Sequence, residues 1–488
     1  MKTTPATATI ERLAAQGHLV GADWRSSVEG GTFQHHYAAT GAVQADIGLA
    51  GAGDIDAAVD AARAAQPAWR DTSPAKRASI LFRLADLLDQ HAEEAAAIGA
   101  LDNGTPINVM RPGLYAANWV RYYAGWCDKL DGEVLPASGD SLRYVRPEPY
   151  GVIAAIPPWN GSMMGMGQKV APALAAGNAV VVKPPELAPF GMLRFGELAL
   201  EAGVPPGVLN IATGGAIAGD ALVRHPGVDK ISFTGSGATA RRILAGAAEH
   251  LTPVALELGG KSANIVFPDA DLDAAASMSA VLGAALLSGQ GCALPTRLYV
   301  HDDVYDDVAA KVTALVESLA VGDPLDPEVV VGPVVSAAAL ERILRVIDRA
   351  RRDGARLLTG GARLGGDLAA GYFIAPTVFA DVDHTSDLAR NEVFGPVLAM
   401  MRFSTEDEVV SKANDSGFGL AAYLHTTDAS RTLRVAHALE AGTVTANGFP
   451  AMAPNTPFGG YKQSGFGREG GRAGIEEFIR RKSVSVVL

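Results

Sequence analysis

From Gly151 onward, short runs of β-forming residues alternate with segments of helical composition. The runs read GVIAAI, NAVVVKP, GVLNIA, DKISFTG and PVALELGG, and the segments between them include KVAPALAAG and GMLRFGELALEAG. Parallel strands have to be joined by crossover connections, which are usually helices, so this alternation predicts a parallel sheet covered on both faces. A second α/β stretch runs from about 263 to 460. The fold class that we expect is therefore α/β.

The segments outside these two stretches are expected to form helices, an exposed hairpin and a C-terminal strand. Residues 54–103 have the apolar spacing of helices. Residues 131–150 form two extended runs around a Gly-Asp turn, with prolines where a central strand would not tolerate them, and this pattern is typical of an exposed hairpin. The last residues, KSVSVVL, alternate as a strand, and we expect them to pair with an edge elsewhere in the chain or in another subunit.

Charge and hydropathy exclude several classes of partner. The formal net charge is −12 and there is no long basic run, so we do not expect nucleic acid to bind. No uninterrupted apolar stretch is long enough for a membrane span, and Glu11 and Arg12 interrupt the region where a signal peptide would be apolar, so we expect a cytoplasmic protein without membrane contact. The two cysteines, Cys127 and Cys292, make neither a disulfide framework nor a zinc-ligand pattern, and we expect no metal site.

A glycine pattern follows the strand-like run KISFT. Residues 235–240 fit G-x-G-x-x-A, which lets a backbone approach a dinucleotide pyrophosphate at the start of a helix. The pattern is weak alone, because the chain contains 55 glycines and an ordinary turn would look the same. The same rule expects an acidic residue about 20 positions later, where it binds a ribose hydroxyl. Glu257 satisfies this spacing, so the rule taken alone assigns Glu257 to a ribose.

The run Gly289-Gln290-Gly291-Cys292 places a thiol between residues without bulky side chains. Such a thiol can act as a nucleophile, although a free cysteine is more often a small buried apolar residue. An unperturbed cysteine has a pKa of about 8.5, so it needs a base or a positive field to become a thiolate. No histidine flanks Cys292, and a carboxylate is therefore the better candidate base.

Two further polar clusters follow strand-like runs directly. Pro157-Pro158-Trp159-Asn160 comes after GVIAAI, and the sequence KPPE ends the next run with Lys183 and Glu186. Open α/β sheets bind ligands at the carboxyl ends of their strands, so Asn160 can donate to an oxyanion, while Lys183 and Glu186 can lie beside a ribose. A turn asparagine and a solvated surface pair are the alternatives.

Together, these segments resemble the aldehyde dehydrogenase superfamily, with order and spacing kept over nearly the whole chain. The matching segments are PWN at 158–160, KPPE at 183–186, HPGVDKISFTGS at 225–236, LELGGKS at 256–262, GQGC at 289–292, NEVFGPV at 391–397 and PFGGYKQSG at 457–465.

The resemblance implies an NAD(P)-linked oxidation of an aldehyde to a carboxylic acid. Cys292 is then the nucleophile, Asn160 an oxyanion donor and Glu257 the base, which replaces the assignment of Glu257 to a ribose. A glutamate at position 186 favours NAD, because it would repel a 2′-phosphate, although NADP stays possible. The cofactor residues that the resemblance implies are Ile156, Pro157, Pro158, Trp159, Lys183, Glu186, Phe233, Gly235, Ser236, Thr239, Leu258, Gly259, Glu392 and Phe394.

This sequence departs from the family pattern near the expected aldehyde tunnel. Gly161 stands where an aromatic residue is common, and Gln168 where tryptophan is frequent. We therefore expect a wider tunnel that takes a bulky hydrophobic or aromatic aldehyde, unless other side chains refill the space. The residues expected to line the aldehyde site are Gly161, Met164, Gln168, Gly291, Ala293, Met452 and Phe458.

The resemblance also implies a three-part subunit. A doubly wound NAD-binding domain comprises residues 1–130 and 150–259, and an α/β catalytic domain comprises residues 260–460. A small oligomerisation hairpin and bridging region comprises residues 131–149 and 461–488. Through this region the subunit is expected to form a homodimer or a homotetramer.

Three other functions stay open at this point. A thiol esterase or acyl-transfer enzyme would use Cys292 and Glu257 without redox chemistry, but it has no need of the cofactor residues. An acylating dehydrogenase would pass the acyl group to coenzyme A, whereas Glu257 favours water. A binding protein on the same fold would have no reason to keep Cys292, Glu257 and Asn160 together.

Overall fold

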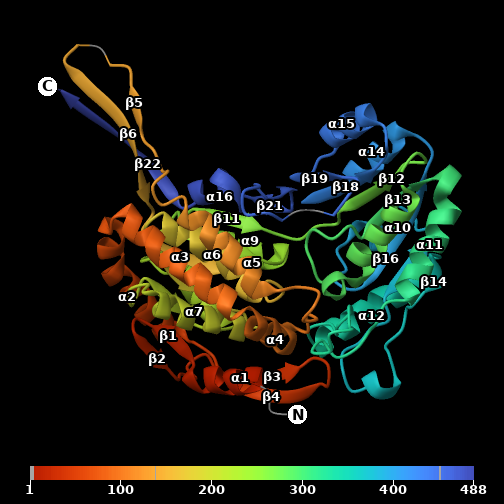
Figure 1. Cartoon of the computed structure of the whole chain (residues 1–488), viewed down its shortest axis with the longest axis horizontal. Helices are drawn as coiled ribbons and strands as arrows, with labels where there is room; N and C mark the ends of the chain where they lie inside the picture. The colour runs from red at the N-terminus through yellow and green to blue at the C-terminus, as the bar shows by residue number, and fades with distance from the viewer. Residues whose placement is uncertain (1–4, 138, 450–451, 488) are drawn as a thin grey trace.

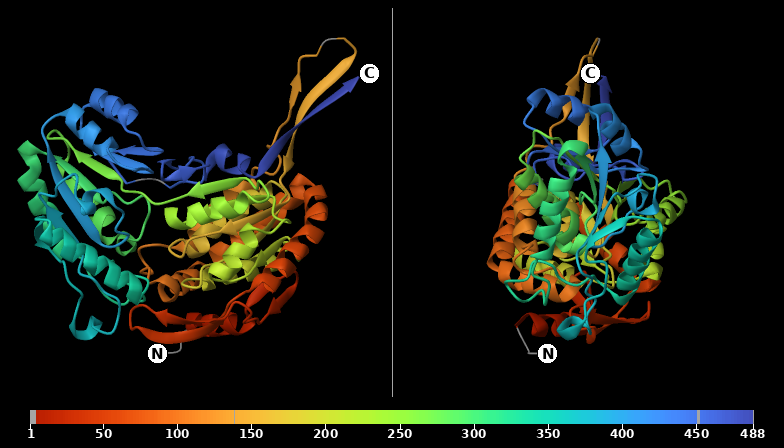
Figure 2. Two further views of the ribbon diagram at one scale, coloured as in Figure 1. Left: turned by 180° about the vertical axis from the view of Figure 1, so that it is seen from behind. Right: turned by 90° about the vertical axis from the view of Figure 1, so that its right-hand side faces the viewer.

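The computed structural model describes residues 5–137, 139–449 and 452–487. Its two larger sheets, of eight and seven strands, lie side by side in the body, and a narrow arm projects from one end (Figures 1 and 2). The first sheet has the order β2 (Asp23–Arg25), β1 (His18–Val20), β9 (Leu209–Ile211), β8 (Ala179–Val182), β7 (Val152–Ile156), β10 (Lys230–Thr234), β11 (Val254–Glu257), β21 (Gly465–Phe466). The α/β prediction is confirmed.

The centre of the first sheet is parallel, because β9, β8, β7, β10 and β11 pair in parallel. Its edges are antiparallel, through β1 and β2 on one side and β21 on the other. The central strands have apolar side chains on both faces, and this is why GVIAAI and NAVVVKP read as continuous apolar runs.

Helices cover both faces of this sheet. On β7, Val152 and Ala154 pack with one group of helices, and Ile153 and Ala155 with the other. The first group is α2 (Ala52–Asp71), α8 (Ala216–Val223) and α9 (Gly237–Ala247). The second group is α3 (Pro74–Gln90), α4 (Ala92–Asn103), α5 (Pro112–Ala124), α6 (Ser162–Ala175) and α7 (Phe190–Ala202), joined by α1 (Pro5–Gln16).

The second sheet is also mostly parallel, with one antiparallel pair, β14 and β15. Its order is β14 (Arg356–Thr359), β15 (Thr377–Ala380), β16 (Val397–Phe403), β13 (Arg297–His301), β12 (Ala263–Val266), β18 (Ala421–His425), β19 (Thr443–Ala446). One face packs on α10 (Leu272–Ala280) and α11 (Tyr305–Glu317). The other packs on α12 (Ala337–Arg352), α13 (Asp387–Arg390), α14 (Glu406–Asn414) and α15 (Ala429–Ala438).

The arm is a three-stranded antiparallel sheet with β6 (Ser141–Pro149) between β5 (Glu133–Leu135) and β22 (Ile479–Val487). The two chain segments are far apart in sequence, yet β22 pairs with β6 along its whole length, from Ile479 opposite Pro149 to Val487 opposite Ser141. Apolar side chains on the arm are solvent-exposed, with Val134 at 77% and Val487 at 86%.

Two smaller strand pairs and a short helix lie outside these three sheets. The hairpin of β3 (Thr32–Tyr37) and β4 (Ala42–Gly48) lies beside α1, β17 (Phe418–Gly419) pairs with β20 (Tyr461–Lys462), and α16 (Gly471–Glu476) precedes β22. Residues 272–289 are long and apolar enough to cross a membrane by length and composition, but 67% of this segment is buried inside the protein. Its hydropathy is accounted for by packing against the second sheet.

Candidate active site

Cys292 follows an abrupt break in a buried helix. The chain of α10 continues as a π turn over 281–285 and a 3₁₀ turn over 286–289, where Leu287 and Ser288 take left-handed backbone angles with φ of 52° and 53°. Such angles are rare outside glycine, so the surroundings must hold this turn. The Ser288 hydroxyl donates to the carbonyl of Gly332 at 2.8 Å. The break ends the helix before Cys292, whose side chain is half-buried.

Glu257 is the last residue of β11. Its backbone carbonyl accepts a hydrogen bond from the N–H of Gly235 at 3.0 Å, which ties β11 to the end of β10. The side chain is only 5% exposed, and among the described residues neither carboxylate oxygen has a hydrogen-bond partner. Burial, with a contribution from the carboxylate of Glu469, raises the pKa of Glu257 well above its usual value. A carboxylate in this state binds a proton more strongly than an exposed one, which suits a general base.

Asn160 links the first sheet to the loop that carries the cysteine. It lies in the turn between β7 and α6, and its side-chain Nδ2 donates to the carbonyl of Gln290 at 2.7 Å. This bond uses one of the two amide hydrogens and leaves the other free for a ligand. The preceding Trp159 packs edge-on against Phe394, with ring centroids 5.5 Å apart. The structure therefore brings together four predicted regions, at 159–160, 290, 292 and 394.

Two glycines allow the strands to meet around the cysteine. A Cβ at Gly260 would collide with the carbonyl oxygen of Cys292, and a Cβ at Gly259 would collide with the carboxylate of Glu392. The N–H of Gly260 instead donates to Oε1 of Glu392 at 3.0 Å. The backbone after Glu257 thus approaches both residues more closely than any larger residue would permit.

The electrostatics of Cys292 disfavour the free thiolate. Burial raises the pKa of its thiol to about 12, and the carboxylates of Glu392, Glu257 and Glu469 add to the increase. A neutral thiol is a poor nucleophile, because the thiolate is the reacting form. Attack by Cys292 therefore requires that a base take its proton or that a bound ligand bring positive charge.

This electrostatic state predicts the pH dependence of alkylation. In the protein without ligands, the rate at which iodoacetamide modifies Cys292 should rise about tenfold for each pH unit from about pH 7 to about pH 10, since the thiolate fraction rises in that proportion below the pKa. Quantifying the modified Cys292 peptide by mass spectrometry measures this rate and separates it from any reaction of Cys127. A plateau near pH 8 would show that the thiol has an ordinary pKa.

A second set of predicted residues lies at the carboxyl end of β8. Lys183 donates from Nζ to the carbonyl of Gly214 at 2.8 Å, and its burial lowers its pKa while the nearby carboxylate of Glu186 raises it. The carboxylate of Glu186 lies beside Gly215, which precedes α8. An amine and a carboxylate at this edge are suited to bind the hydroxyl groups of a ribose.

The start of α9 can receive an anion between these two clusters. Ser236 caps the helix, because its side chain accepts from the N–H of Thr239 at 3.3 Å. The N–H groups that precede Thr239 in the first helical turn point outward from the helix end, where an anion can bind. A Cβ on Gly235 would meet the Phe233 ring at 2.5 Å, so glycine keeps this approach open. The residues present fit a dinucleotide. The other predicted cofactor residues lie at the same strand ends: Ile156 as the last residue of β7, Pro157 and Pro158 directly after it, Phe233 on β10, and Leu258 after β11.

Comparison with known proteins agrees with this arrangement. A family model described as "Aldehyde dehydrogenase family" matches residues 24–484. The chain belongs to the aldehyde dehydrogenase family. It is 43% identical over 467 residues to the putative aldehyde dehydrogenase DhaS of Bacillus subtilis, which covers 95% of this chain and 94% of that protein.

Solved structures of family members have the same fold. The crystal structure of a putative aldehyde dehydrogenase from Burkholderia cenocepacia superposes with a TM-score of 0.95 at 41% identity, covering 96% of this chain and 97% of the other. The NAD+ complex of aldehyde dehydrogenase from Bacillus cereus gives a TM-score of 0.95 at 38% identity, covering 100% and 99%. The predicted family, enzyme class and aldehyde dehydrogenase-like fold are confirmed.

The predicted substrate residues of this family member lie in three places. Gly291 and Ala293 flank the cysteine, while Gly161, Met164 and Gln168 lie on the first turns of α6 or just before it. The side chain of Gln168 is buried and makes no hydrogen bond with the described residues. Phe458 is half-buried in the C-terminal loop, where its N–H donates to the carbonyl of Glu469 at 2.6 Å, and Met452 is 38% exposed.

Aromatic residues close to the cysteine were not predicted from the sequence. The rings of Tyr115 and Trp119 on α5 stack with centroids 5.9 Å apart, and burial raises the pKa of Tyr115, with a smaller contribution from Cys292. The hydroxyl of Tyr423 donates to the carbonyl of Ala293 at 2.9 Å. The spacing of Tyr115 and Trp119 on one helix face was a visible signal, whereas nothing near Tyr423 in sequence indicated its contact.

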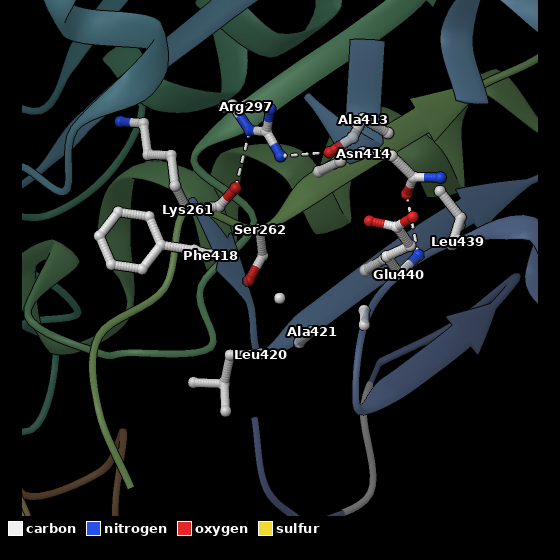
Figure 3. A pocket seen from close by; sticks show the side chains of 14 residues that line it. Lys261, Ser262, Arg297, Ala413, Asn414, Phe418, Leu420, Ala421, Leu439 and Glu440 are labelled. Atoms are coloured by element: carbon white, nitrogen blue, oxygen red, sulfur yellow. Dashed lines mark hydrogen bonds between the residues drawn. The ribbon is translucent and has the colours of Figure 1, made fainter. Parts of the chain in front are cut away.

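Two cavities border the site. One lies against Glu257 and is lined by Lys169, Ser232, Ala255, Arg468, Glu469, Glu477 and Phe478. The other lies beside the start of β12 (Figure 3). In that view the Ser262 hydroxyl points toward the hollow and the Lys261 amine points away from it. Burial lowers the pKa of Lys261 to about 7, and the carboxylate of Glu392 opposes this shift.

Proposed function

We propose that this chain oxidises an aldehyde to the carboxylic acid with NAD+, through a thiohemiacetal and then a thioester on Cys292. The observation that supports it most is the convergence of a half-buried thiol, an unpaired buried carboxylate at Glu257 and a free amide hydrogen on Asn160. These groups come from three separate elements, and such an arrangement matches acyl chemistry at a carbonyl carbon.

The first step is attack of the Cys292 sulfur on the aldehyde carbon. The thiol proton must leave for solvent water as the sulfur attacks, and the positive charge of bound NAD+ would favour the thiolate. The free amide hydrogen of Asn160 and the backbone N–H of Cys292 then hold the oxyanion. One such donor typically lowers the barrier by about 3 to 4 kcal/mol.

The second step is hydride transfer, and bound NAD+ supplies the hydride acceptor. Lys183 and Glu186 would hold one ribose and Glu392 the other, while the start of α9 would receive the pyrophosphate. The Glu186 carboxylate would repel a 2′-phosphate, so NAD is favoured over NADP. The residues that hold the cofactor come mainly from 150–259, in line with the proposed division into an NAD-binding domain of residues 1–130 and 150–259 and a catalytic domain of residues 260–460.

The third step is hydrolysis of the thioester. Glu257 takes a proton from a water molecule, whose oxygen attacks the acyl carbon and releases the acid and the thiol. The raised pKa of Glu257 brings its proton affinity toward working pH, where a general base is most effective. The cavity beside Glu257 gives a place from which water can reach it.

Reduction of NAD+ in the presence of an aldehyde panel, without coenzyme A, tests this function. Aldehyde-dependent formation of NADH and of the free acid is the expected result. Ester cleavage without any NADH would instead favour a thiol esterase, and NADH formation that requires coenzyme A would favour an acylating enzyme.

The proposed substrate is a bulky hydrophobic or aromatic aldehyde. A Cβ on Gly161 would have only ordinary contacts, the nearest at 3.4 Å from Pro158, and the backbone there is not left-handed, so a side chain would fit. Its absence leaves space next to Asn160. The half-buried ring of Tyr115, which stacks on the buried ring of Trp119, offers an aromatic surface near the cysteine.

Filling this space should change the preference between aldehydes. In Gly161→Phe, kcat/KM for a benzaldehyde-type substrate is expected to fall at least about tenfold, because the added ring competes for the same volume, while acetaldehyde oxidation changes less. Gly161→Ala is the matched control and should keep the parent preference. A parent enzyme that prefers acetaldehyde would overturn the proposed substrate class.

We further propose that the arm makes the protein a homodimer or homotetramer. Exposed apolar side chains on β5 and β22 support this, because an isolated three-stranded arm would leave them in water. Size-exclusion chromatography with light scattering measures the state, and a monomer at micromolar concentration would contradict the proposal.

A further inference from the structure

The peptide between Gly259 and Gly260 is held at both of its polar atoms. Its N–H, on Gly260, donates to Oε1 of Glu392 at 3.0 Å. Its carbonyl, on Gly259, accepts from the hydroxyl of Ser464 at 2.7 Å, and no other described residue donates to that oxygen. In a trans peptide the carbonyl and the N–H point to opposite sides, so a bond that fixes one of them also fixes the other. The Ser464 bond therefore sets the direction of the Gly260 N–H.

Glycine leaves this peptide without a side chain to hold it. A Cβ at Gly259 would lie 2.3 Å from the Glu392 carboxylate, and a Cβ at Gly260 would lie 2.3 Å from the carbonyl oxygen of Cys292, so a larger residue would displace one or the other. Glycine populates both signs of φ, so a peptide between two glycines can turn over at little steric cost. The turned peptide would present its carbonyl oxygen to the Glu392 carboxylate, and two acceptors repel. The close approach therefore needs another group to hold the peptide.

The hydroxyl that holds it is itself fixed. Ser464 is completely buried, and its Oγ accepts from the N–H of Gly419 at 3.0 Å. An N–H can only donate and a carbonyl can only accept, so the single hydroxyl proton of Ser464 is directed at the carbonyl of Gly259. The backbone carbonyl of Ser464 also accepts from the N–H of Leu258 at 2.9 Å, beside the pairing of β21 with β11. This backbone bond does not involve the hydroxyl, so it is kept when only the hydroxyl is removed.

Glu392 depends on the N–H that this peptide presents. The bond from Gly260 is the one hydrogen bond that its carboxylate makes with the described residues, and the side chain is half-buried. Burial raises the pKa of Glu392, and the Gly260 N–H acts against this shift, because it stabilises the charged form. Without that bond the carboxylate would lose the donor that both orients it and favours its ionised state.

We propose that Ser464 is a positioning residue for the bound dinucleotide, because its hydroxyl orients the Gly259–Gly260 peptide and that peptide orients Glu392. The inference rests on the proposed function in one respect, which is that Glu392 holds a ribose of the dinucleotide. Removing the hydroxyl should then weaken dinucleotide binding while Glu392 itself is still present.

A double-mutant cycle with Glu392 tests the inference. Fluorescence titration with NADH measures binding directly and does not depend on aldehyde oxidation. Ser464→Ala is expected to raise the Kd for NADH about fivefold to tenfold, the size of one weakened hydrogen bond to a charged group. In a Glu392→Ala background the same change should raise the Kd less than about twofold, because the carboxylate that Ser464 positions is already gone. A general structural role would raise the Kd by the same factor in both backgrounds.

Two further variants keep the test decisive. Ser464→Cys has nearly the same shape but a weaker donor, so it should fold even where Ser464→Ala does not, and should raise the Kd at least about twofold. Ser262→Ala is the matched control and should keep the parent Kd, since Ser262 is also buried, two residues after Gly260, and its hydroxyl has no hydrogen-bond partner among the described residues.

The outcomes separate this inference from the proposed function. If the Ser464 variants keep the parent Kd, or raise it equally with and without Glu392, the inference is wrong. If the parent binds NADH but oxidises no aldehyde, the proposed function fails while the titration still decides the role of Ser464. If the parent binds no NADH, both fail.

Discussion

Replacing Cys292 with alanine should lower aldehyde-dependent NADH formation by on the order of 10⁴-fold or more, because no covalent intermediate can then form. The fold should be unaffected, because the Cys292 side chain is small and half-buried. The close contact of Cys292 with Gly260 is made by the backbone carbonyl and not by the sulfur. Steady-state assays with the preferred aldehyde measure the loss, and a thermal melt close to that of the parent shows that the fold is kept.

The chain offers a matched control for this variant. Cys127 is the other cysteine, and it is buried in the helical layer of the first sheet, where burial raises its pKa to about 11. Cys127→Ala removes one thiol far from the glycine pair and should keep kcat within about twofold, since only a small apolar group is lost. Equal activity in the parent and in Cys292→Ala would contradict the account.

Replacing Glu257 with glutamine should separate the two halves of the reaction. Glutamine has nearly the same shape but cannot take a proton from water, so thioester hydrolysis should slow about 10²- to 10⁴-fold, the usual range for a general base. NADH should then form in a rapid burst equal to the enzyme concentration, followed by slow turnover. Stopped-flow measurement of NADH shows both phases.

The pH profile of the parent gives an independent check on this residue. Hydrolysis needs the ionised form of Glu257, and burial raises its pKa well above the usual value, so the steady-state rate should fall as the pH is lowered through this raised pKa. Glu257→Gln should lose this acid limb. A variant that keeps the parent rate without a burst would show that another group activates the water.

The sequence predicted the centre of each sheet better than its edges. Runs such as VIAAI and AVVV are buried on both faces, so their apolar continuity was sufficient to indicate parallel strands. β21 pairs with β11 through only two residues, Gly465 and Phe466. These lie in a glycine-rich loop that has no strand-like pattern in the sequence. The break at Leu287 and Ser288 also had no signal, since neither residue favours left-handed angles.

The candidate site shows the same division. Cys292, Glu257 and Asn160 lie in distinctive glycine- or proline-rich segments that made them visible. Tyr423 was not visible, because its hydrogen bond to the carbonyl of Ala293 depends on how β18 packs beside the cysteine loop, and it looks like an ordinary strand residue in its own segment. Contacts between distant segments are set by the tertiary fold, which local patterns do not encode.

The central claim is that the acyl group of the substrate becomes bound to Cys292. Intact-protein mass spectrometry of Glu257→Gln, quenched in acid after mixing with NAD+ and an aldehyde, tests it most directly. The account predicts a mass increase equal to the acyl group, placed on Cys292 by peptide mapping and absent from the double variant with Cys292→Ala. Turnover with no adduct, or an adduct on another residue, would contradict it.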